Sequence, residues 1–159
     1  MKSLVFAVTM LFGVWLVWAP AVDAKEAAQD ETRVGNTAFI GYEGSQDWPE
    51  GKSAMVIQDY PVPVYIGLPE NSYRVLGRIY DTRTSGFDVI GRGFDEAFGK
   101  KSHRMRYCAN QAKLHGANAV VVTDDPQVIQ AFGLSRKELK KSAPLFEYRD
   151  RIVLAIKLR

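Results

Sequence analysis

The feature that most constrains this fold is a short apolar run, Ala119 to Val122, which follows closely on a glycine and shows no alternation. A strand with one wet face alternates apolar and polar side chains, whereas a strand covered on both faces does not need to. β-branched valine also favours the extended backbone. We therefore predict a central strand in which at least two of Val120, Val121 and Val122 are buried, on opposite faces of a sheet.

An amphipathic helix is predicted immediately before this strand. Four apolar residues recur at the i, i+3, i+4 and i+7 spacing of one helical face: Met105, Cys108, Ala109 and Ala112. Gly116 follows at a position that suits a left-handed helix end. The basic residues of the segment are assigned to the solvent face: Lys100, Lys101, Arg104, Arg106 and Lys113. Helix, glycine and buried strand together form the second half of a βαβ unit.

Extended segments are also predicted on both sides of this unit. Short ones lie at 36–42, 54–57 and 64–66, and the clearest is Tyr73 to Asp81. Alternation in the clearest strand places four residues on one face: Tyr73, Val75, Gly77 and Ile79. The chain closes with a strand whose apolar face is formed by Ile152, Leu154, Ile156 and Leu158.

Two short helices are predicted between the buried strand and the closing strand. Asp125-Pro126 is typical of an N-cap followed by proline at the first helical position. Ser135-x-x-Glu138 matches a capping box that opens a basic helix through Lys141. The pattern as a whole predicts an α+β fold: a small mixed sheet with one main helix packed on it, in β-β-α-β-α-β order, as a single domain after a signal peptide.

The N-terminal segment predicts export. Lys2 precedes an apolar run from Leu4 to Trp18, and Val22-x-Ala24 resembles a signal peptidase site. The alternative is an uncleaved anchor, because Leu4 to Val22 is just long enough to span a bilayer. We predict a signal peptide at 1–24, a partly flexible arm at 25–52 and an α+β domain at 53–159, in a periplasmic or secreted protein.

The charge balance allows an anionic partner without requiring one. The chain has 21 basic and 18 acidic residues, a net charge of +3. Four basic residues are candidate contacts for an acidic envelope protein or anionic envelope surface: Arg104, Lys137, Lys140 and Lys141. Export argues against nucleic acid as a partner. The oligomeric state is left open.

No catalytic constellation is visible, and no catalytic, cofactor or metal residue is assigned. The segment from Gly93 to Ser102 fails as a phosphate loop, because five residues separate its glycines and Lys101 intervenes before the serine. Cys108 and His115 are seven residues apart, which is about 10 Å along a helix and too far for one zinc ion. Cys108, the only cysteine, is expected to be a buried inert thiol, with a reactive thiol as the alternative.

Two aspartates follow the buried strand, where ligand sites often lie in α/β sheets. Helix capping accounts for Asp125. Asp124 is a candidate for ligand contact, metal binding or acid–base chemistry, with turn or capping duty as the alternative.

Several stretches resemble RcsF-type periplasmic stress-sensor lipoproteins: Pro63 to Tyr65, Tyr73 to Ile79, Arg104-Met105 and Ala112 to Val122. The end of the last stretch is also similar to YbjQ-type and related small envelope domains. The similarity covers about residues 61 to 123 and a final strand. It implies a compact α+β domain that faces the periplasm and works through protein contacts. RcsF-type proteins carry an N-terminal anchor cysteine and two disulfides, whereas this chain has only Cys108, so no functional residue is transferred.

Two classes of function therefore stay open. One is a periplasmic interaction or envelope-sensing module. The other is a small-ligand or metal-binding protein, or a hydrolase, that uses Asp124 and Asp125. A pocket lined by Asp124 and converging polar groups would favour the second class.

The first prediction concerns export. Because Val22-x-Ala24 follows the apolar run, N-terminal sequencing of the exported protein should begin at Lys25. Recovery of an intact Met1 terminus in the membrane fraction would instead support the uncleaved anchor.

Overall fold

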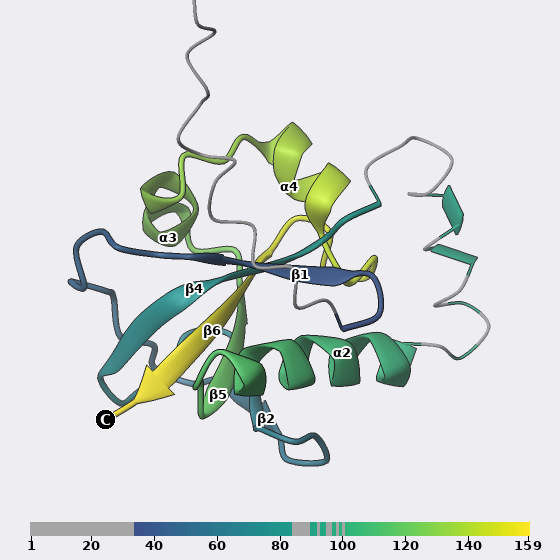
Figure 1. The fold of residues 1–159 in the computed structure, drawn as a ribbon. Helices are drawn as coiled ribbons and strands as arrows, with labels where there is room; N and C mark the ends of the chain where they lie inside the picture. The colour runs from purple at the N-terminus through teal and green to yellow at the C-terminus, as the bar shows by residue number, and fades with distance from the viewer. Residues whose placement is uncertain (1–33, 84–89, 92, 95–96, 98, 100) are drawn as a thin grey trace, which may run out of the picture.

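The computed structural model describes residues 34–83, 90, 91, 93, 94, 97, 99 and 101–159. These residues form a six-stranded sheet and three helices (Figure 1). In chain order the elements are β1 (Thr37–Gly41), β2 (Met55–Ile57), β3 (Val64–Ile66), β4 (Tyr73–Asp81), α2 (Lys101–Leu114), β5 (Ala119–Thr123), α3 (Pro126–Ala131), α4 (Arg136–Ser142) and β6 (Ile152–Leu158). The predicted signal peptide, 1–24, lies outside the described residues.

The sheet is mixed, with strand order β1-β4-β6-β5-β3-β2. β3 and β5 pair in parallel, and the other neighbours pair antiparallel. β6 is inserted between β4 and β5 and is antiparallel to both, so β4, α2 and β5 form a split βαβ unit. The α+β class is thus confirmed, but the element order differs: four strands precede α2, and two helices separate β5 from β6.

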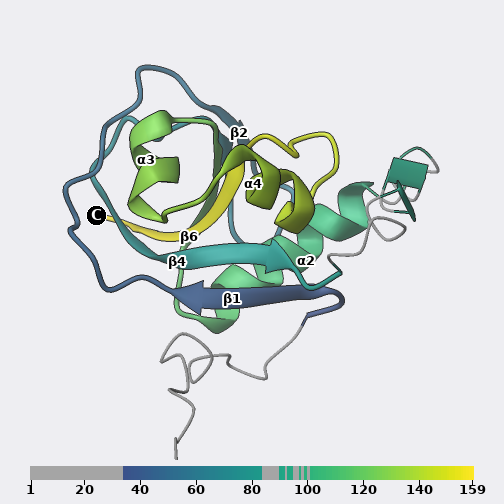
Figure 2. The same cartoon turned by 90° about the horizontal axis from the view of Figure 1, so that it is seen from above.

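Helices cover both faces of the sheet. α2 lies along one face, and α3 and α4 lie on the other (Figures 1 and 2). Val120 and Val122 belong to the apolar cluster under α2, whereas Val121 belongs to the cluster under α3 and α4. All three valines have no exposed surface, which confirms the prediction for the central strand.

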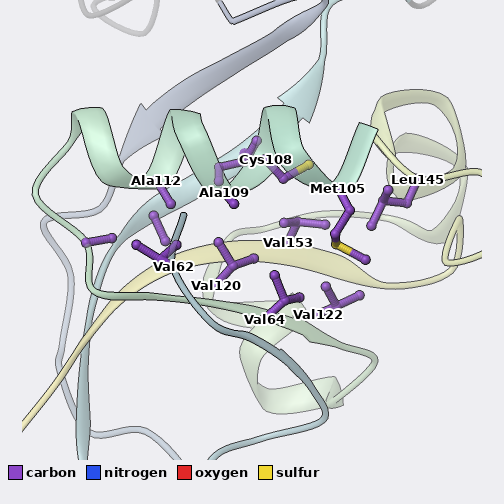
Figure 3. Packing of buried hydrophobic residues seen from close by; sticks show 13 residues of the cluster. Val62, Val64, Met105, Cys108, Ala109, Ala112, Val120, Val122, Leu145 and Val153 are labelled. Atoms are coloured by element: carbon purple, nitrogen blue, oxygen red, sulfur yellow. The ribbon is translucent and has the colours of Figure 1, made fainter. Parts of the chain in front are cut away.

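The predicted apolar face of α2 is also confirmed. Its four residues are at most 1% exposed: Met105, Cys108, Ala109 and Ala112. Figure 3 shows them directed toward the sheet, where they meet Val120 and Val153 among others. Cys108 is therefore a buried thiol in this fold. Gly116 ends the helix with a positive φ of 77°, as a left-handed helix end requires.

One face assignment is wrong, and a β-bulge is the reason. Val75 lies opposite Ile156 while Gly77 lies opposite Ala155, so β4 has one extra residue at this point. A bulge of this kind moves the following side chains to the other face. Tyr73 and Val75 consequently pack under α3 and α4, whereas Ile79 packs under α2.

The closing strand alternates as predicted. Ile152, Leu154 and Ile156 pack under α3 and α4. Leu158 is partly buried against the same cluster. Val153 and Ala155 face α2. β6 thus contributes side chains to both apolar clusters, like its neighbour β5.

The second prediction tests the double coverage of β5. Val121→Asp would place a carboxylate where no water reaches it, so the group would remain charged at large cost or protonate with a strongly raised pKa. Given a typical stability of about 5–15 kcal/mol, we expect a mostly unfolded or insoluble protein. Thermal melts monitored by circular dichroism measure the effect.

Arg106→Asp is the matched control, because Arg106 is exposed on α2. Surface changes usually alter the free energy of unfolding by less than about 0.5 kcal/mol, so its melting temperature should hardly move. A Val121→Asp variant that melts within a few degrees of the wild type would contradict the buried strand.

Candidate functional site

The candidate site lies between α3 and α4, on the face of the sheet that these two helices cover. β5 ends at Thr123, and Asp125 caps α3 as predicted: its Oδ1 accepts hydrogen bonds from the backbone N–H groups of Gln127 (2.9 Å) and Val128 (3.1 Å). Pro126 occupies the first turn, where no N–H is needed. Asp125 therefore has a structural role as the N-cap of α3, and Asp124 is the candidate contact residue of this pair.

The predicted capping box opens α4. The Glu138 N–H donates to Ser135 Oγ at 3.3 Å, and the Ser135 N–H donates to Glu138 Oε2 at 2.8 Å. Leu139 is 3% exposed and holds the helix on the sheet. The only carboxylate of α4 is thus engaged at its start, and the basic side chains lie on the outside of the helix.

A cavity of about 630 Å³ separates α3 from α4. Its apolar wall contains Ile129, Leu134 and Leu139, and its charged lining includes Asp124, Arg136, Lys140 and Asp150. A pocket therefore lies beside Asp124, as the small-ligand hypothesis requires. Asp150 comes from the segment before β6, which sequence spacing does not place near β5.

The charged groups at this cavity are well solvated. Arg151 Nε lies 3.9 Å from Asp124 Oδ2, and the Asp124 side chain is 70% exposed. Lys140 Nζ lies 3.4 Å from Asp150 Oδ1, and here both side chains are more than half exposed, whereas Arg151 in the first pair is 31% exposed. Such exposed pairs contribute about 0–1 kcal/mol, so they can be exchanged for contacts with a partner.

The predicted contact residues of α4 lie next to the cavity. A second depression, of about 380 Å³, is lined by Arg136, Lys137, Lys140 and Lys141. We call these four residues the α4 basic surface. α4 carries four basic residues and one acidic residue within seven positions, a net charge of +3. α2 carries a net charge of +4 over 14 residues, so positive charge is dense on α4 without being confined to it.

The loop after β1 packs against the apolar cluster under α3 and α4. Trp48 packs against Tyr42 and Phe132, with ring centroids 5.0 and 6.3 Å away, and its Nε1–H donates to Gln46 Oε1. Gln46 in turn accepts from the backbone N–H of Val75 at 3.0 Å. Trp48 thus holds this loop against the sheet. β1 and this loop, both within the predicted arm 25–52, lie on the domain.

The pKa of Tyr73, which packs on this face of the sheet, is strongly shifted. Burial, followed by the nearby carboxylates of Asp125 and Glu50, raises the pKa of Tyr73 to about 12. The phenol is therefore protonated at neutral pH and donates to the carbonyl oxygen of Pro49 at 3.0 Å. It serves as a structural hydrogen-bond donor rather than as a base.

Arg104 is not on the solvent face, which corrects the sequence prediction. It is 8% exposed, and its Nη1 lies 3.3 Å from Oδ2 of Asp81, which is 1% exposed. Arg104 precedes Cys108 by four residues and shares its helical face, so its stem follows the apolar stripe. Its partner lies 23 residues earlier, a distance over which sequence pattern gives no signal.

The structure thus divides the predicted contact residues between two places. Asp124 and Lys140 line the same cavity, and Lys137 and Lys141 adjoin it, whereas Arg104 belongs to a separate ionic cluster with Asp81. Sequence reasoning missed Asp81. Its position at the end of a strand, two residues before Arg83, was the available signal.

The described residues offer little for metal or imidazole chemistry. They contain no group of three or more His, Cys, Asp or Glu side chains that could hold a metal ion. His115 stacks on Phe39 with ring centroids 3.8 Å apart, and its Nε2 lies 3.3 Å from Gln111 Nε2. This histidine is part of the packing between α2 and β1.

Comparison with known proteins finds no match among family models, curated proteins or solved structures. Within the described part of the chain, no helix has the length and apolar character needed to cross a membrane. The cavities and the exposed charged side chains are therefore the basis for proposing a function.

Proposed function

We propose that this chain is an exported protein-interaction domain whose α4 basic surface binds an acidic segment of a partner protein in the cell envelope. The observation that carries the proposal is the density of exposed charge: α4 holds a net +3 within seven residues, and its four basic side chains together line one surface depression. A focused positive field speeds association with an acidic partner and selects against basic ones.

The surroundings of α4 favour a protein partner over a lipid surface. The adjoining cavity has an apolar wall that includes Ile129 and Leu134, which suits side chains of a folded or extended partner. Asp124 and Asp150 line the same cavity, and their carboxylates can pair with basic side chains of a protein partner, which a purely anionic surface does not offer. A partner segment with mixed apolar and acidic side chains, and a basic residue for Asp124, would complement this surface.

The sequence supports the cellular setting of the proposal. The signal-peptide pattern at 1–24 supports a proposed location in the periplasm or outside the cell. The resemblance to RcsF-type and YbjQ-type envelope domains agrees with a function through protein contacts. Envelope sensing would be one use of such contacts.

A small-ligand function is the second candidate, and the cavity itself favours it. A volume of about 630 Å³ is within the usual range for ligand sites, and Asp124 lines it together with Arg136 and Lys140. The high exposure of Asp124 makes a protein partner the better fit, because ligand sites usually bury their specific polar groups.

The third prediction tests the interaction function by cross-linking. A lysine-reactive cross-linker applied to intact envelopes should join the exported protein to an identified partner through Lys137 and Lys141. Exposed lysines elsewhere serve as internal controls: Lys52, Lys113 and Lys157. Mass spectrometry of the cross-linked peptides shows which lysines formed the cross-links. Cross-links should be enriched at α4 and face acidic segments of the partner.

Charge reversal provides the matched pair of variants. Lys137→Glu with Lys141→Glu should also abolish the partner cross-links formed by Lys140, which keeps its amine in this variant, whereas Lys113→Glu should retain them. Each exposed change should affect stability by less than about 0.5 kcal/mol, so folding is preserved. Cross-links spread evenly over all lysines, or binding to anionic phospholipid vesicles without any protein cross-link, would contradict the proposal.

A further inference from the structure

The strand β2 forms one edge of the sheet and leaves an apolar surface uncovered. In the part of the chain that the structure describes, β2 pairs with β3 on one side only, and its Met55 and Val56 side chains are 57% and 39% exposed. Successive side chains of a strand point to opposite faces of the sheet, so β2 is apolar toward solvent on both faces. An edge strand also directs backbone N–H and C=O groups away from the sheet, where another strand can pair with them.

The inner side of β2 is held firmly in the sheet. The segment before the strand follows the same neighbour, because the Gly51 N–H donates to the Pro69 carbonyl oxygen at 2.8 Å. Ile57 packs against the apolar cluster under α2, and Val64, which lies opposite it in β3, has no exposed surface. The outer edge is therefore held in an extended form before a partner arrives, which lowers the entropic cost of pairing.

The opposite edge of the sheet, β1, is covered more fully. Thr37 and Ala38 are 3% and 5% exposed, and the Phe39 ring stacks on His115 with ring centroids 3.8 Å apart. Charged side chains on the strand and a covered edge both protect against unwanted strand pairing. β2 contains no charged residue and its side chains are not covered in this way, so it is the edge that favours pairing.

The charges that flank β2 indicate what kind of chain fits this edge. Lys52 precedes the strand and Asp59 follows it, and both side chains are exposed. Two-fold antiparallel pairing with β2 of a second copy would place the Lys52 end of each copy beside the Asp59 end of the other. Two opposite-charge pairs would then flank a centre formed by Met55 and Val56 of both copies. The edge is therefore complementary to itself.

From this arrangement we propose that the chain forms a weak two-fold dimer through antiparallel pairing of the β2 edges. Pairing would continue the six-stranded sheet from one copy into the next and remove Met55 and Val56 from water. An interface made by one short strand falls below about 1,200 Å², the range of transient contacts, so we expect a dissociation constant between micromolar and millimolar. The interface shares no residue with the α4 basic surface.

The fourth prediction tests the dimer by sedimentation velocity of the purified protein from micromolar to millimolar concentration. The weight-average sedimentation coefficient should rise with concentration from the monomer value toward the dimer value. In ¹⁵N-labelled protein, the backbone amides whose NMR signals shift most over the same range should be those of residues 52–59.

Two variants of matched exposure separate edge pairing from general apolar association. Met55→Lys places like charges close to the two-fold axis and should leave the protein monomeric at every concentration. Leu114→Lys changes a side chain of nearly equal exposure, 58%, at the end of α2 and should dimerise like the wild type. Both changes are at the surface, so both variants should fold.

A charge exchange tests the antiparallel arrangement. Lys52→Glu places a carboxylate beside Asp59 of the other copy and should weaken dimerisation by about threefold or more, because two attractive pairs become repulsive. Lys52→Glu combined with Asp59→Lys restores opposite charges at both ends of the interface. This double variant should regain most of the lost affinity.

Four results would overturn the proposal. The first is a monomer at every concentration. The second is an equal effect of Met55→Lys and Leu114→Lys on dimerisation. The third is a failure of the charge exchange to restore dimerisation, which would exclude the antiparallel arrangement. The fourth is a monomeric chain whose Lys52 cross-links to a different envelope protein, which would assign this edge to that protein.

Discussion

The rest of the structure depends on the burial of β5 from both sides. All five residues of this strand, Ala119 to Thr123, are buried, and their side chains alternate between the two apolar clusters. Strands on both sides satisfy the backbone hydrogen bonds, with β3 parallel and β6 antiparallel. A strand in this position joins the two faces into one cooperative unit, because removing it would expose both cores at once.

The two faces of this sheet hold charged side chains differently. On one face, Leu139 anchors α4, and the basic side chains of this helix are exposed, where they can contact a partner. On the other face, Arg104 of α2 and Asp81 at the end of β4 are buried and form an ion pair. This pair joins α2 to the sheet in addition to the apolar contacts of the helix.

Local sequence patterns were sufficient to predict the elements that depend on interactions between residues close together in the chain. The unbroken valine run, the apolar stripe of α2 and the capping box at Ser135 each depend on residues within a few positions of one another. The bulge in β4 could not be read in this way, because it arises from pairing with β6. At the bulge Gly77 approaches the Ile40 carbonyl oxygen and the Phe39 ring too closely for any Cβ, a contact that only the folded sheet creates.

The same distinction applies to the candidate sites. The basic residues of α4 and the aspartates after β5 are close in sequence, so they were identified, but the cavity between them also needs Asp150 from the segment before β6. Arg104 was misassigned because a basic residue was taken as solvent-exposed, and its buried partner lies on another element. The order β-β-α-β-α-β was also too short: the extended segments predicted at 36–42, 54–57 and 64–66 all contain strands, but their weak local patterns did not show that each would pair in the sheet.

Native-state hydrogen exchange tests the central role of β5 most directly. If the strand joins both cores, the backbone amides of Val120, Val121 and Val122 should exchange only through global unfolding and be the slowest in the domain. The amides of the edge strand β2, where Met55 and Val56 are exposed, should exchange through local opening at lower free energy. Exchange of the β5 amides at the rate of those in β2 would contradict this account of the fold.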